Sequence, residues 1–121
     1  MALIAATKIP AGAVFGSVAY ADATGADSFA ADNADGRMIV LLKNTDTANA
    51  AAVVFKAGDG LFGGLGDVAV SVPANATVAV PVARLASARV KNLTGVNQGL
   101  VLLTETLGTI SNLKLAVLSV A

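Results

Sequence analysis

The segment Gly58–Gly63 matches the pattern G-x-G-x-x-G. In dinucleotide-binding proteins this pattern opens a helix, whose N-terminal amides hold a pyrophosphate. Here it leads instead into residues 68–72, where valines alternate with smaller side chains as in a strand. We therefore predict that Gly58–Gly63 is a loop between strands and that the chain binds no cofactor.

Acidic residues near glycines suggest a second kind of chemistry, the binding of a hard cation. The segment Gly63–Asp67 is one residue short of the G-G-x-G-x-D spacing of calcium-binding β-rolls, and it occurs once, whereas rolls need several repeats. Asp32, Asp35 and Asp46 have suitable oxygen ligands, but aspartates near glycines and asparagines are more typical of ordinary turns. We predict no metal site.

Catalysis by imidazole or thiol is excluded, because the 121 residues include no His and no Cys. Paired carboxylates remain conceivable as the basis of a small hydrolase, but nothing in the sequence brings two of the eight acids together. The eight basic residues balance them, and one Tyr and four Phe give no stacking platform for nucleic acid. We expect a protein that is not an enzyme and does not bind nucleic acid directly.

The hydrophobic character of the chain does not predict a membrane protein, although its mean hydropathy is +0.74. The longest uncharged stretch has 16 residues, from Val68 to Ala83, and contains Pro73 and Pro81. A spanning helix needs about 20 apolar residues. The beginning of the chain also lacks the long apolar run of a signal peptide. We therefore expect that the protein does not associate with membranes. We also expect that it is synthesised in the cytoplasm.

Short alternating segments separated by turns predict an all-β fold. We expect a single domain over residues 1–121, a small antiparallel β-sandwich or jelly-roll-like structure with residues 37–121 as its core. Residues 1–20 are expected to be an extended N-terminal arm, with a possible strand over 13–20. Residues 84–90 fit a helix or a strand. Strands are predicted over residues 37–43, 51–56, 68–72, 78–82, 100–104 and 113–120. Pro81 indicates that its strand lies at an edge or contains a bulge.

Several large apolar side chains lie outside the predicted strands. Leu61, Phe62 and Leu65 interrupt the glycine loop, where they either pack under the loop against the core or contact a neighbouring subunit. The candidate apolar contacts of the arm are Ile4, Ile9 and Phe15. With 13% charged residues and 26 alanines, the chain has little charge for its surface and small side chains for its core. We therefore expect an oligomer.

The order of turns and strands over residues 35–120 resembles that of small bacteriophage capsid decoration proteins, also called auxiliary head or cement proteins. The N-terminal third is less similar. The segments that carry the resemblance are Asp35–Arg37, Lys43–Asn44, Lys56–Gly60, Pro73–Thr77, Ala88–Asn92, Thr94–Gly95 and Gly99–Val101.

This resemblance implies a β-sandwich protein, often trimeric, on the outside of an icosahedral head. It would bind the major capsid protein where capsid subunits meet and would stabilise the shell, so its location would be the virion surface after synthesis in the bacterial host. The alternative hypothesis is a surface-exposed binding or adhesion module that recognises a carbohydrate or a host receptor. The absence of Trp and the small number of aromatic residues make this alternative less favoured than the capsid hypothesis.

Overall fold

Alternating burial along the longest strands explains why this sequence forms two layers. Every second side chain is buried in β5 (Met38–Asn44), and β10 (Leu113–Val120) buries its alternate residues Leu113, Leu115 and Val117. The two strands are antiparallel neighbours, with Leu115 opposite Leu42. A period of two places these apolar side chains on one face of a sheet, which must then be covered by a second layer.

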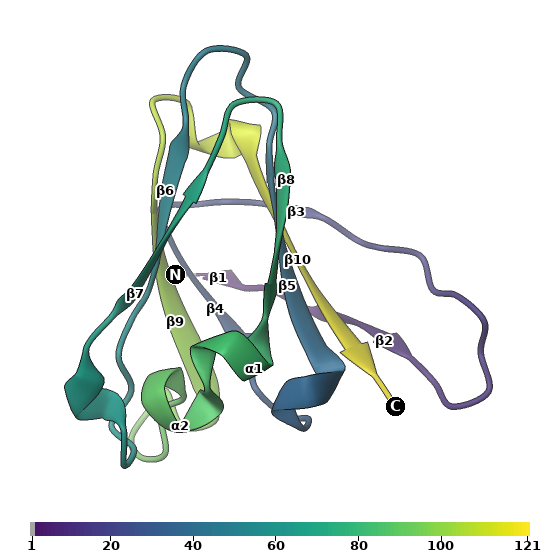
Figure 1. Cartoon of the computed structure of the whole chain (residues 1–121), viewed down its shortest axis with the longest axis vertical. Coiled ribbons are helices and arrows are strands. Elements are labelled where there is room, and N and C mark those ends of the chain that lie inside the picture. Colours follow the sequence, from purple (N-terminus) through teal and green to yellow (C-terminus); the bar gives the residue numbers. More distant parts are fainter. Residues whose placement is uncertain (1) are drawn as a thin grey trace.

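The computed structural model describes residues 2–121, which form two mixed five-stranded sheets facing each other in a β-sandwich-like arrangement (Figure 1). The first sheet has the order β1 (Ala2–Leu3), β4 (Ala26–Ala30), β9 (Leu100–Thr106), β6 (Ala51–Phe55) and β7 (Val68–Val72). The second has the order β2 (Ala6–Ile9), β10, β5 and β8 (Thr77–Pro81), with β3 (Ala21–Asp22) also beside β10.

The core lies between the sheets and is closed at one end by two single-turn helices. Its largest fully buried side chains include Phe29 and Phe55 of the first sheet. The helices α1 (Val82–Leu85) and α2 (Ser87–Val90) follow β8 and cover the lower end of the sandwich in Figure 1. Their buried side chains are Val82, Leu85 and Val90. Of residues 84–90, for which the sequence left helix and strand open, all are therefore helical except Ala86, which separates the two helices with a positive φ.

The predicted strands of the core are confirmed. They correspond to β5, β6, β7, β8, β9 and β10 with shifts of one or two residues at their ends. The edge position predicted from Pro81 is also confirmed, because β8 pairs with β5 alone among the described residues and ends the second sheet. A proline has no amide hydrogen for a further strand, which makes an edge the compatible place for it.

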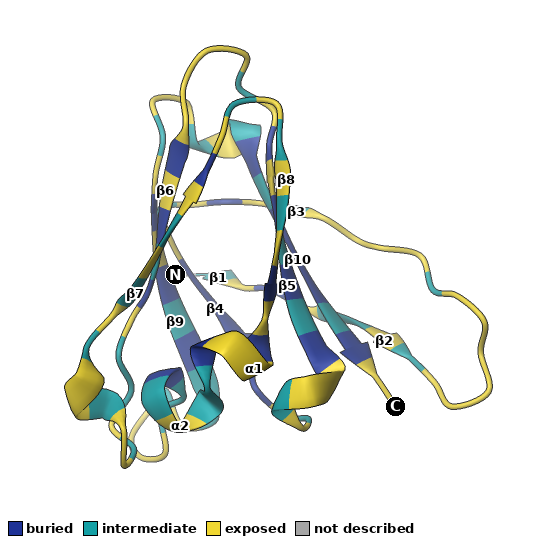
Figure 2. Cartoon of the chain, viewed as in Figure 1, coloured by how far each residue is buried: buried dark blue, intermediate teal, exposed yellow. Residues whose placement is uncertain are grey.

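The N-terminal region differs from the sequence prediction. Residues 2–9 lie in the sandwich, because β1 runs parallel to β4 and β2 runs parallel to β10. These parallel pairs make both sheets mixed rather than antiparallel. The strand expected over residues 13–20 is wrong, since residues 10–20 form a loop without strand structure (Figure 1). Nearly all of this loop is exposed (Figure 2), so it had no neighbouring strand with which to pair.

Three further short segments connect the strands near the ends of the sandwich. The 3-10 turns η1 (Asp35–Arg37) and η2 (Gly63–Leu65) lie at the same end as the helices, and η3 (Ile110–Asn112) precedes β10. Over residues 2–121, no helix has the length and apolar character needed to cross a bilayer.

Candidate functional site

The glycine-rich loop between β6 and β7 has a fixed conformation, because its backbone is bonded to α2. The amide of Gly58 donates to the carbonyl of Arg89 at 2.8 Å, and the amide of Phe62 donates to the carbonyl of Ala88 at 3.2 Å. Within the loop, the amide of Gly63 donates to the carbonyl of Gly60 at 3.0 Å. Backbone hydrogen bonds of this kind remove much of the freedom that a glycine-rich segment would otherwise have.

Two glycines of the G-x-G-x-x-G pattern are required by this close approach. A Cβ atom on Gly58 would overlap the carbonyl group of Lys91, and one on Gly63 would overlap the carbonyl oxygen of Gly58. The pattern ends in η2 and then β7 rather than in a helix, which confirms that it is a loop between strands. Its glycines are therefore explained by backbone packing.

The Arg89 side chain holds the second half of the loop. Its guanidinium donates to the carbonyl oxygens of Gly66 at 2.9 Å, Leu65 at 3.0 Å and Asp67 at 3.1 Å. The carboxylate of Asp67 accepts from the Ala57 amide at 2.7 Å and pairs with the Lys56 ammonium at 2.9 Å, and these two partners lower its pKa in that order of importance. Both ends of the loop are thereby fixed to β6 and α2.

The Asp59 side chain joins the glycine loop to the neighbouring loop between α2 and β9. Its carboxylate accepts hydrogen bonds of 2.6 Å from the Thr94 hydroxyl and from the Leu93 amide. The Thr94 hydroxyl, followed by the Leu93 amide, lowers the pKa of Asp59. Gly60 packs closely against the Leu93 side chain. The two loops therefore form one surface.

This surface presents large apolar side chains to solvent. Leu61 is 85% exposed, Phe62 50%, Leu65 66% and Leu93 50%. We call these four residues the glycine-loop patch; its loop is the largely exposed segment at the lower left of Figure 2. Of the two possibilities that the sequence left open, packing under the loop against the core is not what the structure has. Several exposed large apolar side chains on one ordered loop are typical of a protein-binding surface.

A second exposed apolar group lies in the 10–20 loop. Val14 is 96% exposed and Phe15 81%, while Ile9, at the end of β2, is only partly exposed. Ile4 differs from its predicted place on a contact surface: it is 5% exposed and belongs to the core, between β1 and β2. The sequence did not show this because two short strands flank Ile4, each too brief to give a periodic pattern.

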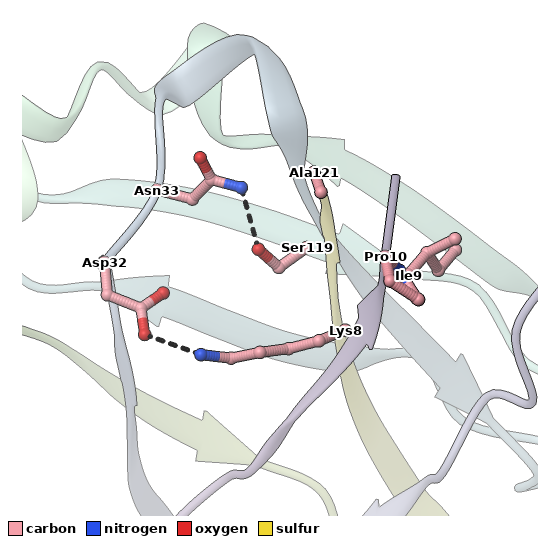
Figure 3. A pocket seen from close by; sticks show the side chains of 7 residues that line it. All are labelled: Lys8, Ile9, Pro10, Asp32, Asn33, Ser119 and Ala121. Atoms are coloured by element: carbon pink, nitrogen blue, oxygen red, sulfur yellow. Dashed lines mark hydrogen bonds and ion pairs between the residues drawn. The ribbon is translucent and has the colours of Figure 1, made fainter. Parts of the chain in front are cut away.

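A pocket of about 500 Å³ lies at the end of β2 and β10, beside the segment that follows β4 (Figure 3). Lys8 and Asp32 form an exposed ion pair of 3.2 Å across it, and the Asn33 amide donates to the Ser119 hydroxyl at 2.9 Å. The other lining residues are Ile9, Pro10 and Ala121. Asp32 is the one acidic side chain among the lining residues, so the pocket lacks the two acidic side chains that a glycosidase mechanism requires.

The structure does bring two acids together, but elsewhere. Asp27 of β4 and Glu105 of β9 are 0% and 6% exposed, and neither lines the pocket. The sequence prediction did not find this pair, because the strand predicted over residues 100–104 ends one residue before Glu105. The signal was present, since Glu105 continues the inward alternation of Val101 and Leu103.

Neither a search for metal-binding side chains nor comparisons with known proteins identify a further functional site. Within the described part of the chain, no three acidic side chains are grouped in a way that could hold a metal ion. Comparisons with protein families, curated proteins and solved structures find no match to this chain. The candidate functional site therefore rests on geometry alone, and the glycine-loop patch is the surface that the geometry defines best.

Proposed function

We propose that this protein is a structural subunit of a bacteriophage virion, which decorates the outside of the capsid by binding the major capsid protein. The observation that supports this most is the glycine-loop patch. Its backbone is held by Arg89 and Asp59 before any partner arrives. An ordered loop loses little conformational entropy on binding, so its exposed apolar area contributes more of its free energy to association.

We propose further that the protein acts as a homotrimer. A ring of three identical subunits uses heterologous contacts, in which one surface of a subunit meets a different surface of the next. The chain offers two separate apolar surfaces, the glycine-loop patch and the 10–20 loop with Val14 and Phe15, which extend from different sides of the sandwich in Figure 1. In this proposal, the arm expected over residues 1–20 supplies its contacts from residues 10–20.

Stabilisation of the shell follows from binding in this proposal, without any catalytic step. A subunit that binds only the assembled shell stabilises that shell by a free energy of RT ln(1 + [L]/Kd), where [L] is the concentration of free subunit. The protein would be made in the bacterial cytoplasm and would then be found on the outer surface of the virion.

The experiment that tests the proposal combines two measurements on one set of variants. Sedimentation velocity gives the oligomeric state, and co-sedimentation with shells of the proposed partner, the major capsid protein of the same phage, gives binding. The variant Leu61→Ser with Phe62→Ser removes much of the patch, and Val96→Ser is the matched control, because Val96 is 99% exposed on the neighbouring loop. Unchanged mass and unchanged shell binding in the double variant would contradict the proposal.

A further inference from the structure

The acid pair of Asp27 and Glu105 lies inside the sandwich. Asp27 is opposite Leu103 in the antiparallel pairing of β4 and β9, so Glu105 is its diagonal neighbour on the same face. That face is the inner one, because Phe29 and Leu103 also point to the core. Diagonal neighbours on one face of a sheet are within reach of a long side chain such as glutamate.

Hydrogen-bond donors surround one member of the pair and not the other. The carboxylate of Asp27 accepts from the Thr24 amide at 2.9 Å and from the Thr24 hydroxyl at 2.7 Å, and it interacts with the backbone amide of Ala2. In contrast, neither carboxyl oxygen of Glu105 has a hydrogen-bond donor among residues 2–121. Buried polar atoms without partners are rare in folded proteins because they cost free energy.

A proton between the two carboxyl groups resolves this imbalance. Burial, and then the neighbouring Asp27, raise the pKa of Glu105 to about 8. Burial alone would raise the pKa of Asp27 as well, but hydrogen bonds from Glu105 and Thr24 outweigh it and lower that pKa. A protonated Glu105 donates to an ionised Asp27, and two adjacent carboxylates then never share the site.

Within residues 2–121, the strands around the acid pair contain no unpaired cation that could replace the proton. In the first sheet, β1, β6 and β7 have no titratable residue. In the second sheet, β8 has none, and the charged side chains of the other strands have partners of their own. These partnerships are Lys8 with Asp32, Lys114 with Asp22, and Lys43 with the ring of Tyr20.

We propose that Asp27 and Glu105 share one proton, and that this proton links strand β1 and the turn containing Thr24 to the first sheet. The link is physical, since Asp27 binds the Thr24 turn directly and interacts with the Ala2 amide. When the proton leaves, two carboxylates face each other in the core. The repulsion is relieved when this end of β4, with β1, separates and admits water.

Hydrogen exchange of the backbone amides tests the proposal directly. The reporters are the Ile4 amide, bonded to Ser28 at 2.8 Å, and the Glu105 amide, bonded to Gly25 at 3.0 Å. The open form loses its proton near the ordinary pKa of 4.5 and the closed form near 8. After correction for intrinsic exchange, opening should increase by up to about tenfold per pH unit within this window and level off above it.

Two variants give the matched comparison. Glu105→Gln retains a donor toward Asp27 and should abolish the pH dependence of both reporters, whereas Asp32→Asn alters an exposed acid and should leave it unchanged. The same pH dependence in wild type and Glu105→Gln would overturn the proposal. If Glu105→Gln does not fold, the carboxyl carbon resonance of Glu105 in the wild type decides, since a midpoint near the ordinary value of 4.5 excludes the shared proton.

A bound cation is the competing explanation of the acid pair. The two Thr24 donors and the Ala2 amide point toward Asp27, which disfavours a cation there. Calcium chloride is the probe, with chelator as its control. An unchanged melting temperature supports the proton, and an increase that is lost in Glu105→Gln overturns it.

Discussion

The Arg89 side chain donates a hydrogen bond of 2.9 Å to the carbonyl oxygen of Gly66, and so connects α2 with the glycine loop. Loop and helix therefore behave as one unit at the end of the sandwich. The glycine-loop patch is ordered for this reason, although each of its side chains is at least half exposed.

Replacing Arg89 tests this connection. The substitution Arg89→Ala removes donors to three carbonyl groups and should lower the free energy of unfolding by about 1–2 kcal/mol, because the site is partly exposed. It should also weaken self-association by disordering the patch. Chemical denaturation and sedimentation measure the two effects. Arg84→Ala is the control, because Arg84 is exposed and makes no side-chain hydrogen bond within residues 2–121, and equal losses in both variants would contradict the argument.

Three glycines of the loop should respond differently to alanine. Gly58→Ala and Gly63→Ala place a Cβ against backbone carbonyl groups, and each should cost about 1–3 kcal/mol or more. Gly64→Ala is a matched control in the same loop, since nothing lies within 4 Å of its Cβ position. Thermal unfolding of the three variants provides the comparison. A Gly63→Ala protein as stable as Gly64→Ala would mean that the loop adopts another conformation.

Alanine substitutions at the neighbouring residues Leu3 and Ile4 test whether the N-terminal segment belongs to the sandwich. Ile4 is buried, so Ile4→Ala should lower the free energy of unfolding by about 2–4 kcal/mol. Leu3 is 64% exposed, and Leu3→Ala should change it by less than about 0.5 kcal/mol. Urea denaturation distinguishes the two. Equal, small effects would indicate that residues 2–9 are a free arm in solution.

The 10–20 loop should contribute to association and not to folding. Val14→Ser with Phe15→Ser alters two highly exposed side chains, so the melting temperature of the isolated subunit should stay the same. The proposed trimer should dissociate at a higher protein concentration than in wild type. Sedimentation at several concentrations measures this, and a trimer of unchanged affinity would place the subunit contact elsewhere.

Global stability should decrease as the pH rises from about 4.5 to about 8. In this window the folded state keeps the Glu105 proton and the unfolded state has lost it, which costs up to about 1.4 kcal/mol per pH unit and then levels off. The effect of Asp27 on stability has the opposite sign. Its lowered pKa contributes stability above about pH 3.8, and this contribution is lost as the pH falls further. Maximum stability is therefore expected at mildly acidic pH.

Urea denaturation over a pH series measures this profile. Glu105→Gln should remove the decrease toward pH 8 while keeping the loss in acid. A wild-type protein whose stability rises between about pH 5 and about pH 8 would contradict the assignment of the proton.

The core strands could be predicted from the sequence because valine and leucine alternate along them, as in Val68–Val72 and Leu113–Val120. The glycine loop could be predicted from its composition, but the direction of its apolar side chains could not. That direction depends on where Arg89 and Asp59 hold the backbone, and both residues act through contacts more than 20 positions away.

The first four strands escaped prediction for a different physical reason. Ala2–Leu3 and Ala6–Ile9 are too short to show a period, and they are strands because β4 and β10 provide partners for their backbone. In β4, an aspartate occupies an inward position where the pattern would favour an apolar residue. Its hydrogen-bond donors come from Thr24, and Glu105 of the neighbouring strand lies diagonally opposite it. A compensation of this kind cannot be recognised in a linear pattern.

The parallel pairing of β2 with β10, in which Ala6 lies opposite Val117, has a consequence for how the protein is made. β2 must wait for a strand that leaves the ribosome more than a hundred residues later. Until β10 has been synthesised, the backbone groups of Ala6–Ile9 have no partner in the second sheet. Such long-range pairing slows folding because a large loop must close first. We therefore expect the pairing of β2 with β10 to form late in folding, only after β10 has been synthesised.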